Sequence, residues 1–290
     1  MTSSPPIALV FGASGQIGMP LLQRLRVAGW QVLALSRQRQ AQTEDVRWLR
    51  GSFDQMPALP AQVAAVFGCG PLDHFAQWYA DARLCSPRVI AFGSTSVHVK
   101  QASVDAAERD VAQRLRQAEL QLFASAAARG EAVTVLRPTL VYGAARDATL
   151  TRIASLARRH GRFVLPATAV GRRQPVHVDD LAAAALAAAA ARASHGHGYD
   201  LPGGETLAYC EMVQRVLGCL SPPPRLHRLP LPVFRALRVL ARMRGIAGDL
   251  SDAAIARMGE DLVFDAEPAR RDFGYSPRPF VPQAAMFTAR

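Results

Sequence analysis

The sequence is short of lysine, of acidic residues and of long apolar runs, and each shortage narrows the class of protein. Lys100 is the only lysine among 34 basic residues, which outnumber the 23 acidic residues and give a formal charge of +11. The arginines are spread through every segment, a distribution typical of a high-GC genome, and no DNA-reading motif accompanies them. We therefore expect no nucleic-acid partner, whereas arginines near a pocket would suit an anionic substrate.

Cysteine is scarce as well. The four cysteines are Cys69, Cys85, Cys210 and Cys219. Their spacing is not that of a metal site, and residues 1–6 lack the positively charged start of a signal peptide. The alanine-rich stretch 181–193 is too short to span a bilayer, which takes about 20 apolar residues, and it follows two aspartates as a core helix does. We expect a cytoplasmic protein with reduced thiols, no metal ion and no membrane span.

Three glycines at intervals of three follow the first apolar run of the chain. Residues 7–11 predict a buried parallel strand, and the stretch 19–28 is compatible with a helix. Between them stand Gly12, Gly15 and Gly18. A tight turn here needs residues without Cβ, and the N–H groups at a helix start attract phosphate. The arrangement predicts a dinucleotide-binding turn; the alternative is a turn that only packs strand on helix.

This spacing resembles that of the short-chain dehydrogenase/reductase superfamily. The likeness continues in the segments 90–97, 118–119, 136–143, 174–181 and 264–277. Two of these, Leu136-Arg-Pro-Thr-Leu-Val-Tyr-Gly143 and Gln174-Pro-Val-His-Val-Asp-Asp-Leu181, are similar to the extended branch, the NAD(P)-dependent epimerase/dehydratase family. The resemblance covers roughly residues 7–280 and is weakest over 220–262.

One pair that this resemblance implies is missing. In the superfamily a tyrosine acts as acid/base, and a lysine four residues later lowers its pKa and holds the ribose. No tyrosine stands four residues before a lysine in this chain, because Ser96 precedes Lys100 at that spacing. Counting from Glu119, which matches the family's glutamate, the two positions hold Val111 and Leu115. The usual mechanism therefore cannot be carried over with the fold.

Alternating apolar runs and helical patterns predict an α/β fold, a Rossmann-type doubly wound parallel sheet. We expect strands near 6–11, 31–36, 46–49, 63–68, 88–93, 133–137 and 199–201, and helices near 16–28, 73–84, 104–129, 149–160 and 179–192. Residues 1–143 plus 176–201 should form the dinucleotide-binding Rossmann domain. Residues 144–175 plus 202–290 should form a smaller C-terminal substrate-binding or lid region.

The end of the second strand indicates which nicotinamide cofactor is bound. NAD-preferring enzymes place an acidic residue there, whereas Ser36 and Arg37 favour the 2′-phosphate of NADP. NAD remains the alternative, because Arg37 can instead be a solvated residue. Ser52 and Phe53 should face the adenine. The expected cofactor-binding residues are Gly12, Ala13, Ser14, Gly15, Gln16, Ile17, Gly18, Ser36, Arg37, Ser52, Phe53, Gly68, Cys69, Gly70 and Pro138.

The catalytic candidates also rest on the resemblance. Ser94 matches the family's catalytic serine, and with Thr95 it could donate hydrogen bonds to a substrate. His98, Tyr142 or Lys100 could supply the proton, although His98 matches a position of an aromatic residue in the family, which favours packing. The expected catalytic residues are Ser94, Thr95, His98 and Tyr142.

Three functions stay open. The first is an NADP-linked oxidoreductase or epimerase with a non-standard acid/base, acting on a sugar nucleotide or similar carbonyl or alcohol. The second is a non-catalytic NADP-binding regulatory or structural protein, and the third is a lyase or isomerase without redox turnover. Arg172 and Arg173 match the family's phosphate-docking arginine or form a surface pair. The basic amphipathic stretch 229–244 suits a membrane, a partner or solvent, and a homodimer is left open.

Overall fold

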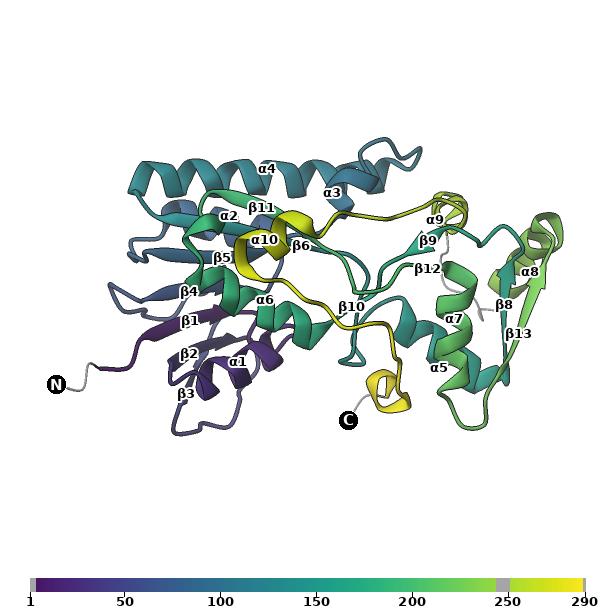
Figure 1. Ribbon diagram of the computed structural model, residues 1–290, viewed down its shortest axis with the longest axis horizontal. Helices are drawn as coiled ribbons and strands as arrows, with labels where there is room; N and C mark the ends of the chain where they lie inside the picture. Colours follow the sequence, from purple (N-terminus) through teal and green to yellow (C-terminus); the bar gives the residue numbers. More distant parts are fainter. Residues whose placement is uncertain (1–3, 244–250, 289–290) are drawn as a thin grey trace.

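The centre of the molecule is a seven-stranded parallel sheet (Figure 1). The computed structural model describes residues 4–243 and 251–288. The sheet has the order β11-β6-β5-β4-β1-β2-β3. Its strands are β1 (Ile7–Phe11), β2 (Gln31–Ser36), β3 (Val46–Arg50), β4 (Ala65–Gly68), β5 (Arg88–Phe92), β6 (Ala132–Pro138) and β11 (His197–Leu201). The order runs outward in both directions from β1 and β4, so the predicted doubly wound α/β fold is confirmed.

Helices cover both faces of this sheet (Figure 1). On one face α1 (Gly18–Val27) contacts α6 (Val178–Ala190), and α10 (Glu267–Phe273) lies against α6. On the other face α2 (Leu72–Asp81) contacts α4 (Ala106–Arg129). The alanine-rich α6 is buried along most of its length, as expected of a core helix, because its small side chains allow close approach to the sheet. Among the described helices, none combines the length and the apolar character that crossing a bilayer requires.

Most of the remaining elements lie beyond the carboxyl ends of the sheet strands (Figure 1). They are β7 (Val141–Tyr142), α5 (Leu150–His160), β8 (Arg162–Pro166), β9 (Arg172–Arg173), β10 (Val176–His177), β12 (Leu207–Ala208), α7 (Tyr209–Gly218), β13 (Arg225–Leu229), α8 (Leu231–Met243), α9 (Asp252–Arg257) and η2 (Ala284–Phe287). A hydrophobic cluster separate from the two that flank the sheet holds most of them together, with Leu150, Met212 and Phe280 among its buried members.

The division of the chain into a Rossmann domain and a substrate-binding region stays a prediction. One segment of the expected substrate-binding region, around α10, packs against the central sheet. Ala269 and Tyr275 pack into the cluster on the α1 and α6 side of the sheet, although sequence placed 202–290 in the substrate-binding region. The basic stretch 229–244 starts at the last residue of β13 and continues as α8, with Phe234 buried and Leu237 exposed. Its last residue, Arg244, lies outside the described residues.

Local signals bring the functional segments to the carboxyl edge of the sheet. The chain turns after β5 into the one-turn helix α3 (Ser96–Val99), and α4 starts where the Asp105 carboxylate accepts the backbone N–H of Ala107 at 2.9 Å. Gly130, with a φ of +66°, ends α4 in the left-handed conformation that favours glycine. Parallel strands end at the same edge, so the loops after β1, β2, β4, β5 and β6 all lie along it.

Candidate functional site

The glycine-rich loop between β1 and α1 is shaped by contacts of its own backbone. A Cβ on Gly12, whose φ is +65°, would lie 2.7 Å from the carbonyl carbon of Cys69. A Cβ on Gly18 would lie 2.3 Å from the Gly12 carbonyl oxygen. A Cβ on Gly15 would meet only the Gly12 carbonyl group, at 2.9 Å from the oxygen, and is otherwise open. Gly12 and Gly18 therefore serve the turn itself, and the free side of the loop is at Gly15.

The end of β2 lies beside this loop. Its last residue is Ser36, so a hydroxyl group stands where NAD-preferring enzymes are expected to have a carboxylate. The Ser14 and Ser36 hydroxyl oxygens are 3.2 Å apart, and the Ser36 hydroxyl accepts the N–H of Gln38 at 3.2 Å. Ser36 is buried and Arg37 is exposed, and the Arg37 side chain has no hydrogen bond or ion pair within the described parts of the chain. Hydroxyls with an uncommitted arginine suit a phosphate better than a ribose diol.

The loops after β3 and β4 complete this side of the edge. The Phe53 ring stacks on Phe11 with centroids 5.4 Å apart, and a Cβ on Gly70 would only touch Phe53, at 3.9 Å. Gly68 is required by packing, since its Cβ would lie 2.9 Å from the Phe75 ring. Burial raises the pKa of the Cys69 thiol to about 12, which keeps it neutral.

These residues fit a dinucleotide. The first turn of α1 contains no acidic side chain, so nothing opposes an anion at its positive end. The side-chain oxygen Oε1 of Gln16, in the loop itself, is buried and has no hydrogen-bond partner within residues 4–243 and 251–288, which is costly unless a ligand or water pairs with it. Ala13 and Ile17 are buried apolar residues of the loop and contribute backbone only. Ser52 donates its backbone N–H to the Gln55 carbonyl at 3.1 Å.

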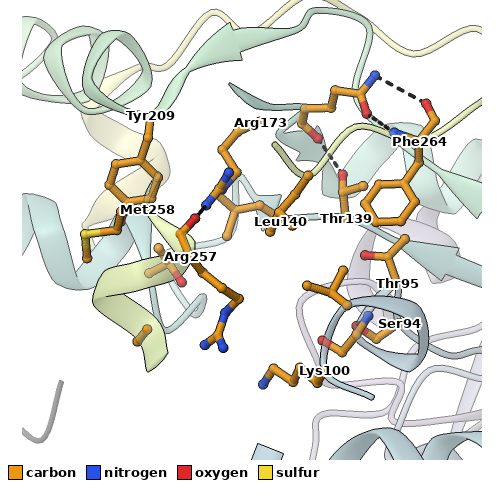
Figure 2. A pocket seen from close by; sticks show the side chains of 16 residues that line it. Ser94, Thr95, Lys100, Thr139, Leu140, Arg173, Tyr209, Arg257, Met258 and Phe264 are labelled. Carbon is orange, nitrogen blue, oxygen red and sulfur yellow. Dashed lines mark hydrogen bonds between the residues drawn. The ribbon is translucent and has the colours of Figure 1, made fainter. Parts of the chain in front are cut away.

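A pocket of about 340 Å³ opens beside α3, between the sheet edge and the outlying region (Figure 2). Its cationic lining residues are Lys100, Arg173 and Arg257, and its described lining contains no carboxylate. Ser94 and Thr95 border it from the end of β5, and Phe264 and Tyr209 supply aromatic walls. The charge of this lining favours an anion.

The hydroxyl groups of Ser94 and Thr95 differ in the hydrogen bonds that they make within the protein. The Thr95 hydroxyl is buried and donates to the Pro138 carbonyl oxygen at 3.2 Å, which joins the β5 loop to the end of β6. The Ser94 hydroxyl accepts the N–H of Ser96 at 3.1 Å. Because that bond uses the Ser94 oxygen only as an acceptor, its O–H hydrogen remains able to reach a bound molecule.

The Lys100 side chain has no hydrogen-bond or ion-pair partner among the residues that the structure describes, and only its backbone is bonded, to Ser96 and Ser103. In Figure 2 its side chain extends toward the same opening as that of Arg257. Arg257 is already neutralised, because both of its terminal nitrogens bond to the Glu108 carboxylate. Glu108 also accepts from the Ser103 hydroxyl at 2.6 Å. Lys100 therefore supplies a positive charge beside Ser94 that no ion pair compensates within the described residues.

The Glu108–Arg257 pair ties the start of α4 to α9 across the mouth of the pocket. Burial alone would raise the pKa of Glu108, but the hydrogen bonds from Arg257 and Ser103, with the nearby charges of Arg257 and Lys100, hold it below its ordinary value. Both side chains are largely buried, with exposed fractions of 18% and 12% for Arg257 and Glu108. Sequence gave no indication of this pair, since its members are 149 residues apart.

Two of the residues expected to supply a proton do not line this pocket. His98 points from α3 to Asp200, with Nε2 3.1 Å from the carboxylate oxygen, and Arg137 lies 3.7 Å from the same oxygen. Tyr142 is buried between the rings of His177 and Phe280, at centroid distances of 5.1 and 4.9 Å. Burial raises the pKa of Tyr142 to about 12. Both residues thus make structural contacts where sequence suggested proton donors.

The side chains of Arg172 and Arg173, the two residues of β9, make hydrogen bonds within the protein. Arg173 is buried and donates to the carbonyl oxygens of Arg172, Glu260 and Arg257, and its guanidinium lies over the Tyr209 ring. Arg172 is exposed and bonds to Asp261, with Nε 2.8 Å from the carboxylate. These contacts join β9 to the end of α9 and the residues after it, and of the two arginines Arg173 lines the pocket.

The positions expected for the missing acid/base pair lie on α4. Val111 and Leu115 are half-buried there, and Leu115 packs against the cluster on the α2 and α4 face of the sheet. Neither is among the residues that line the pocket. Neither side chain can exchange a proton, because both are apolar.

No family model and no curated protein matches the chain. Solved structures do match. Epimerase Mth375 from Methanothermobacter thermautotrophicus is 14% identical with a TM-score of 0.70, covering 95% of this chain and 88% of that one. MoeE5 in complex with UDP-glucuronic acid and NAD is 18% identical with a TM-score of 0.68, covering 95% and 94%. UDP-glucuronic acid 4-epimerase from Bacillus cereus in complex with NAD is 12% identical with a TM-score of 0.68, covering 95% and 94%. At these identities the likeness establishes a shared fold.

Proposed function

We propose that the protein binds a nicotinamide dinucleotide, with a preference for NADP, and uses it to convert an anionic carbonyl or alcohol substrate such as a sugar nucleotide. The observation that carries this proposal is the uncompensated Lys100 beside Ser94, in a pocket whose described lining bears positive charge only. The structural relatives support the substrate class, because MoeE5 is described with UDP-glucuronic acid, which is anionic, and with NAD.

Ser94 and Lys100 would take the place of the missing tyrosine and lysine. When bound, the nicotinamide would exchange a hydride with the substrate carbon. The Ser94 hydroxyl donates a hydrogen bond to the substrate oxygen, and the Lys100 ammonium stabilises the negative charge that develops on it. In the reducing direction Nζ of Lys100 transfers its proton to that oxygen, and in the oxidising direction the neutral amine takes the proton back.

The preference for NADP rests on the end of β2. The buried hydroxyl of Ser36 lies beside that of Ser14, and the uncommitted guanidinium of Arg37 follows directly. Together they suit the 2′-phosphate, which a carboxylate at this position would repel. NAD remains the alternative, since solved structures of the same fold, MoeE5 and the Bacillus cereus epimerase among them, are described with NAD.

A non-catalytic dinucleotide-binding protein is the second candidate. Val111 and Leu115 favour it, because both positions of the usual acid/base pair have become apolar and one packs into the core. A regulatory or structural protein would keep the glycine-rich loop and need no proton donor. The two candidates differ in one respect only, which is turnover.

Two measurements test the proposal. Calorimetric titration with NADPH and NADH should give tighter binding of NADPH. A panel of sugar nucleotides and other anionic carbonyl or alcohol substrates should then show turnover that falls about 10²- to 10⁴-fold in Lys100→Met and in Ser94→Ala. His98→Ala and Tyr142→Phe test the two donors outside the pocket. A wild type that binds cofactor and turns over nothing supports the non-catalytic candidate, and loss of activity in His98→Ala alone contradicts the role of Lys100.

A further inference from the structure

An arginine from the outlying region reaches back to the glycine-rich loop. Arg146 lies between β7 and α5, and a terminal nitrogen of its guanidinium donates to the carbonyl oxygen of Ser14, 132 residues earlier in the chain. Ser14 directly precedes Gly15, the position where the loop is open. None of the sequence motifs pointed to Arg146, because only the folded chain brings it to this loop.

The backbone on both sides of Arg146 is fixed. Ala145 adopts a φ of +54°, which is uncommon for a residue with a Cβ, and its N–H donates to the Met286 carbonyl at 2.9 Å. The Asp147 carboxylate accepts the N–H groups of Thr149 and Thr151 at 3.1 and 3.0 Å. A left-handed non-glycine residue persists only where its surroundings hold it, and such residues gather at ligand sites. The segment therefore directs Arg146 onto the loop.

The contact with Ser14 leaves most of the N–H donors of the Arg146 guanidinium unused. A carbonyl oxygen is neutral and uses one of the five donors of a guanidinium. No carboxylate pairs with Arg146 in the portion of the chain that is described. The side chain is thus an exposed, uncompensated positive charge at a phosphate-binding turn, and the flat fork of arginine suits two phosphate oxygens at once.

We propose that Arg146 binds the diphosphate of the dinucleotide and so closes the outlying region over the cofactor. This rests on the proposed dinucleotide binding and adds a residue to it. Arg37 and Arg146 then have separate tasks, because Arg37 contacts only the 2′-phosphate of NADP, whereas the diphosphate is common to NADP, NAD and ADP-ribose.

The test compares three diphosphate ligands, with AMP as a control ligand, in three variants by calorimetric titration. Arg146→Ala should weaken NADPH, NADH and ADP-ribose by the same factor, about 10- to 100-fold, with no loss for AMP beyond that of a control. Arg152→Ala, which removes an exposed arginine from α5, is the matched control and should leave all affinities unchanged. Arg146→Gln keeps an N–H donor for the Ser14 carbonyl without the charge, and it should bind as weakly as Arg146→Ala.

Each other outcome overturns the inference. If Arg146→Gln binds like the wild type, Arg146 only shapes the loop. If Arg146→Ala weakens NADPH alone, it belongs with Arg37 at the 2′-phosphate, and unchanged affinities mean that it has no contact with cofactor. A wild type that binds none of the three ligands would overturn the proposed function as well, whereas retained wild-type binding confines the failure to Arg146. Thermal unfolding of every variant verifies that the fold is kept.

Discussion

The loop after β1 and the segment after β5 lie along the same edge of one sheet, yet they agree to different degrees with the motifs expected from sequence. In the β1 loop all three expected glycines are present, and backbone atoms 2.3 and 2.7 Å away leave no room for a Cβ at Gly18 and Gly12. The β5 segment has the expected Ser94, but Val111 and Leu115 on α4 stand where the acid/base pair is expected. A site built from backbone tolerates little change, whereas one built from side chains can be rebuilt with groups from elsewhere.

The largest effect should come from Gly15→Val. Its branched side chain would occupy the open side of the loop, so we expect no measurable binding of NADPH or NADH in titration calorimetry. The protein should still fold, because a Cβ at Gly15 meets only the Gly12 carbonyl group. Gly12→Val should instead lower the melting temperature too, since it adds a clash with Cys69 to an unfavourable φ. Retained binding in Gly15→Val would move the dinucleotide to another site.

The second largest effect should come from Lys100, which lines the pocket beside the β5 segment. Lys100→Met should lower turnover about 10²- to 10⁴-fold while the dissociation constant for NADPH stays within about two-fold, because Lys100 faces the pocket and not the glycine-rich loop. Steady-state kinetics and cofactor titration on the same preparation separate the two quantities. Equal losses in both would mean that the two regions are not independent.

A smaller effect, on the free energy of unfolding, should come from the Glu108–Arg257 pair beside the pocket. Glu108→Gln removes the charge that holds Arg257, and we expect a loss of about 1.5 to 3 kcal/mol in the free energy of unfolding. The folded pKa of Glu108 is lowered, so its contribution is present above the ordinary carboxyl pKa and is lost as the pH falls through the lowered value. Denaturant titrations between pH 3 and pH 7 should therefore converge for wild type and variant at the acid end. A constant difference across this range would contradict the assignment.

The smallest effect should be the choice of cofactor. Arg37→Ala should weaken NADPH about ten-fold, the lower end for a charge-assisted contact because the side chain is exposed, and leave NADH unchanged. Fluorescence titration with both reduced cofactors at two salt concentrations measures it. The NADPH difference should shrink at high salt, and equal affinities of the wild type for both cofactors would contradict the preference.

Sequence predicted the parts of the fold that local rules govern. The seven strands of the sheet and the helices α1, α2, α4, α5 and α6 lie where apolar periodicity placed them, to within a few residues at their ends. The proline-rich residues 221–224 lead from α7 into β13, a strand that was not predicted from sequence. β13 pairs with β8 in parallel across a long separation, which a local pattern cannot indicate.

By itself, the sequence determined the doubly wound sheet and the glycine-rich turn, since both depend on backbone conformation and on the alternation of neighbouring residues. Only the tertiary structure decided the composition of the pocket. It turned His98 toward Asp200 and buried Tyr142, and it brought Arg257 to Glu108 and Arg146 to Ser14. The three polar contacts join residues more than 100 positions apart, so they follow from the packing of whole elements, and no spacing in the sequence indicates them.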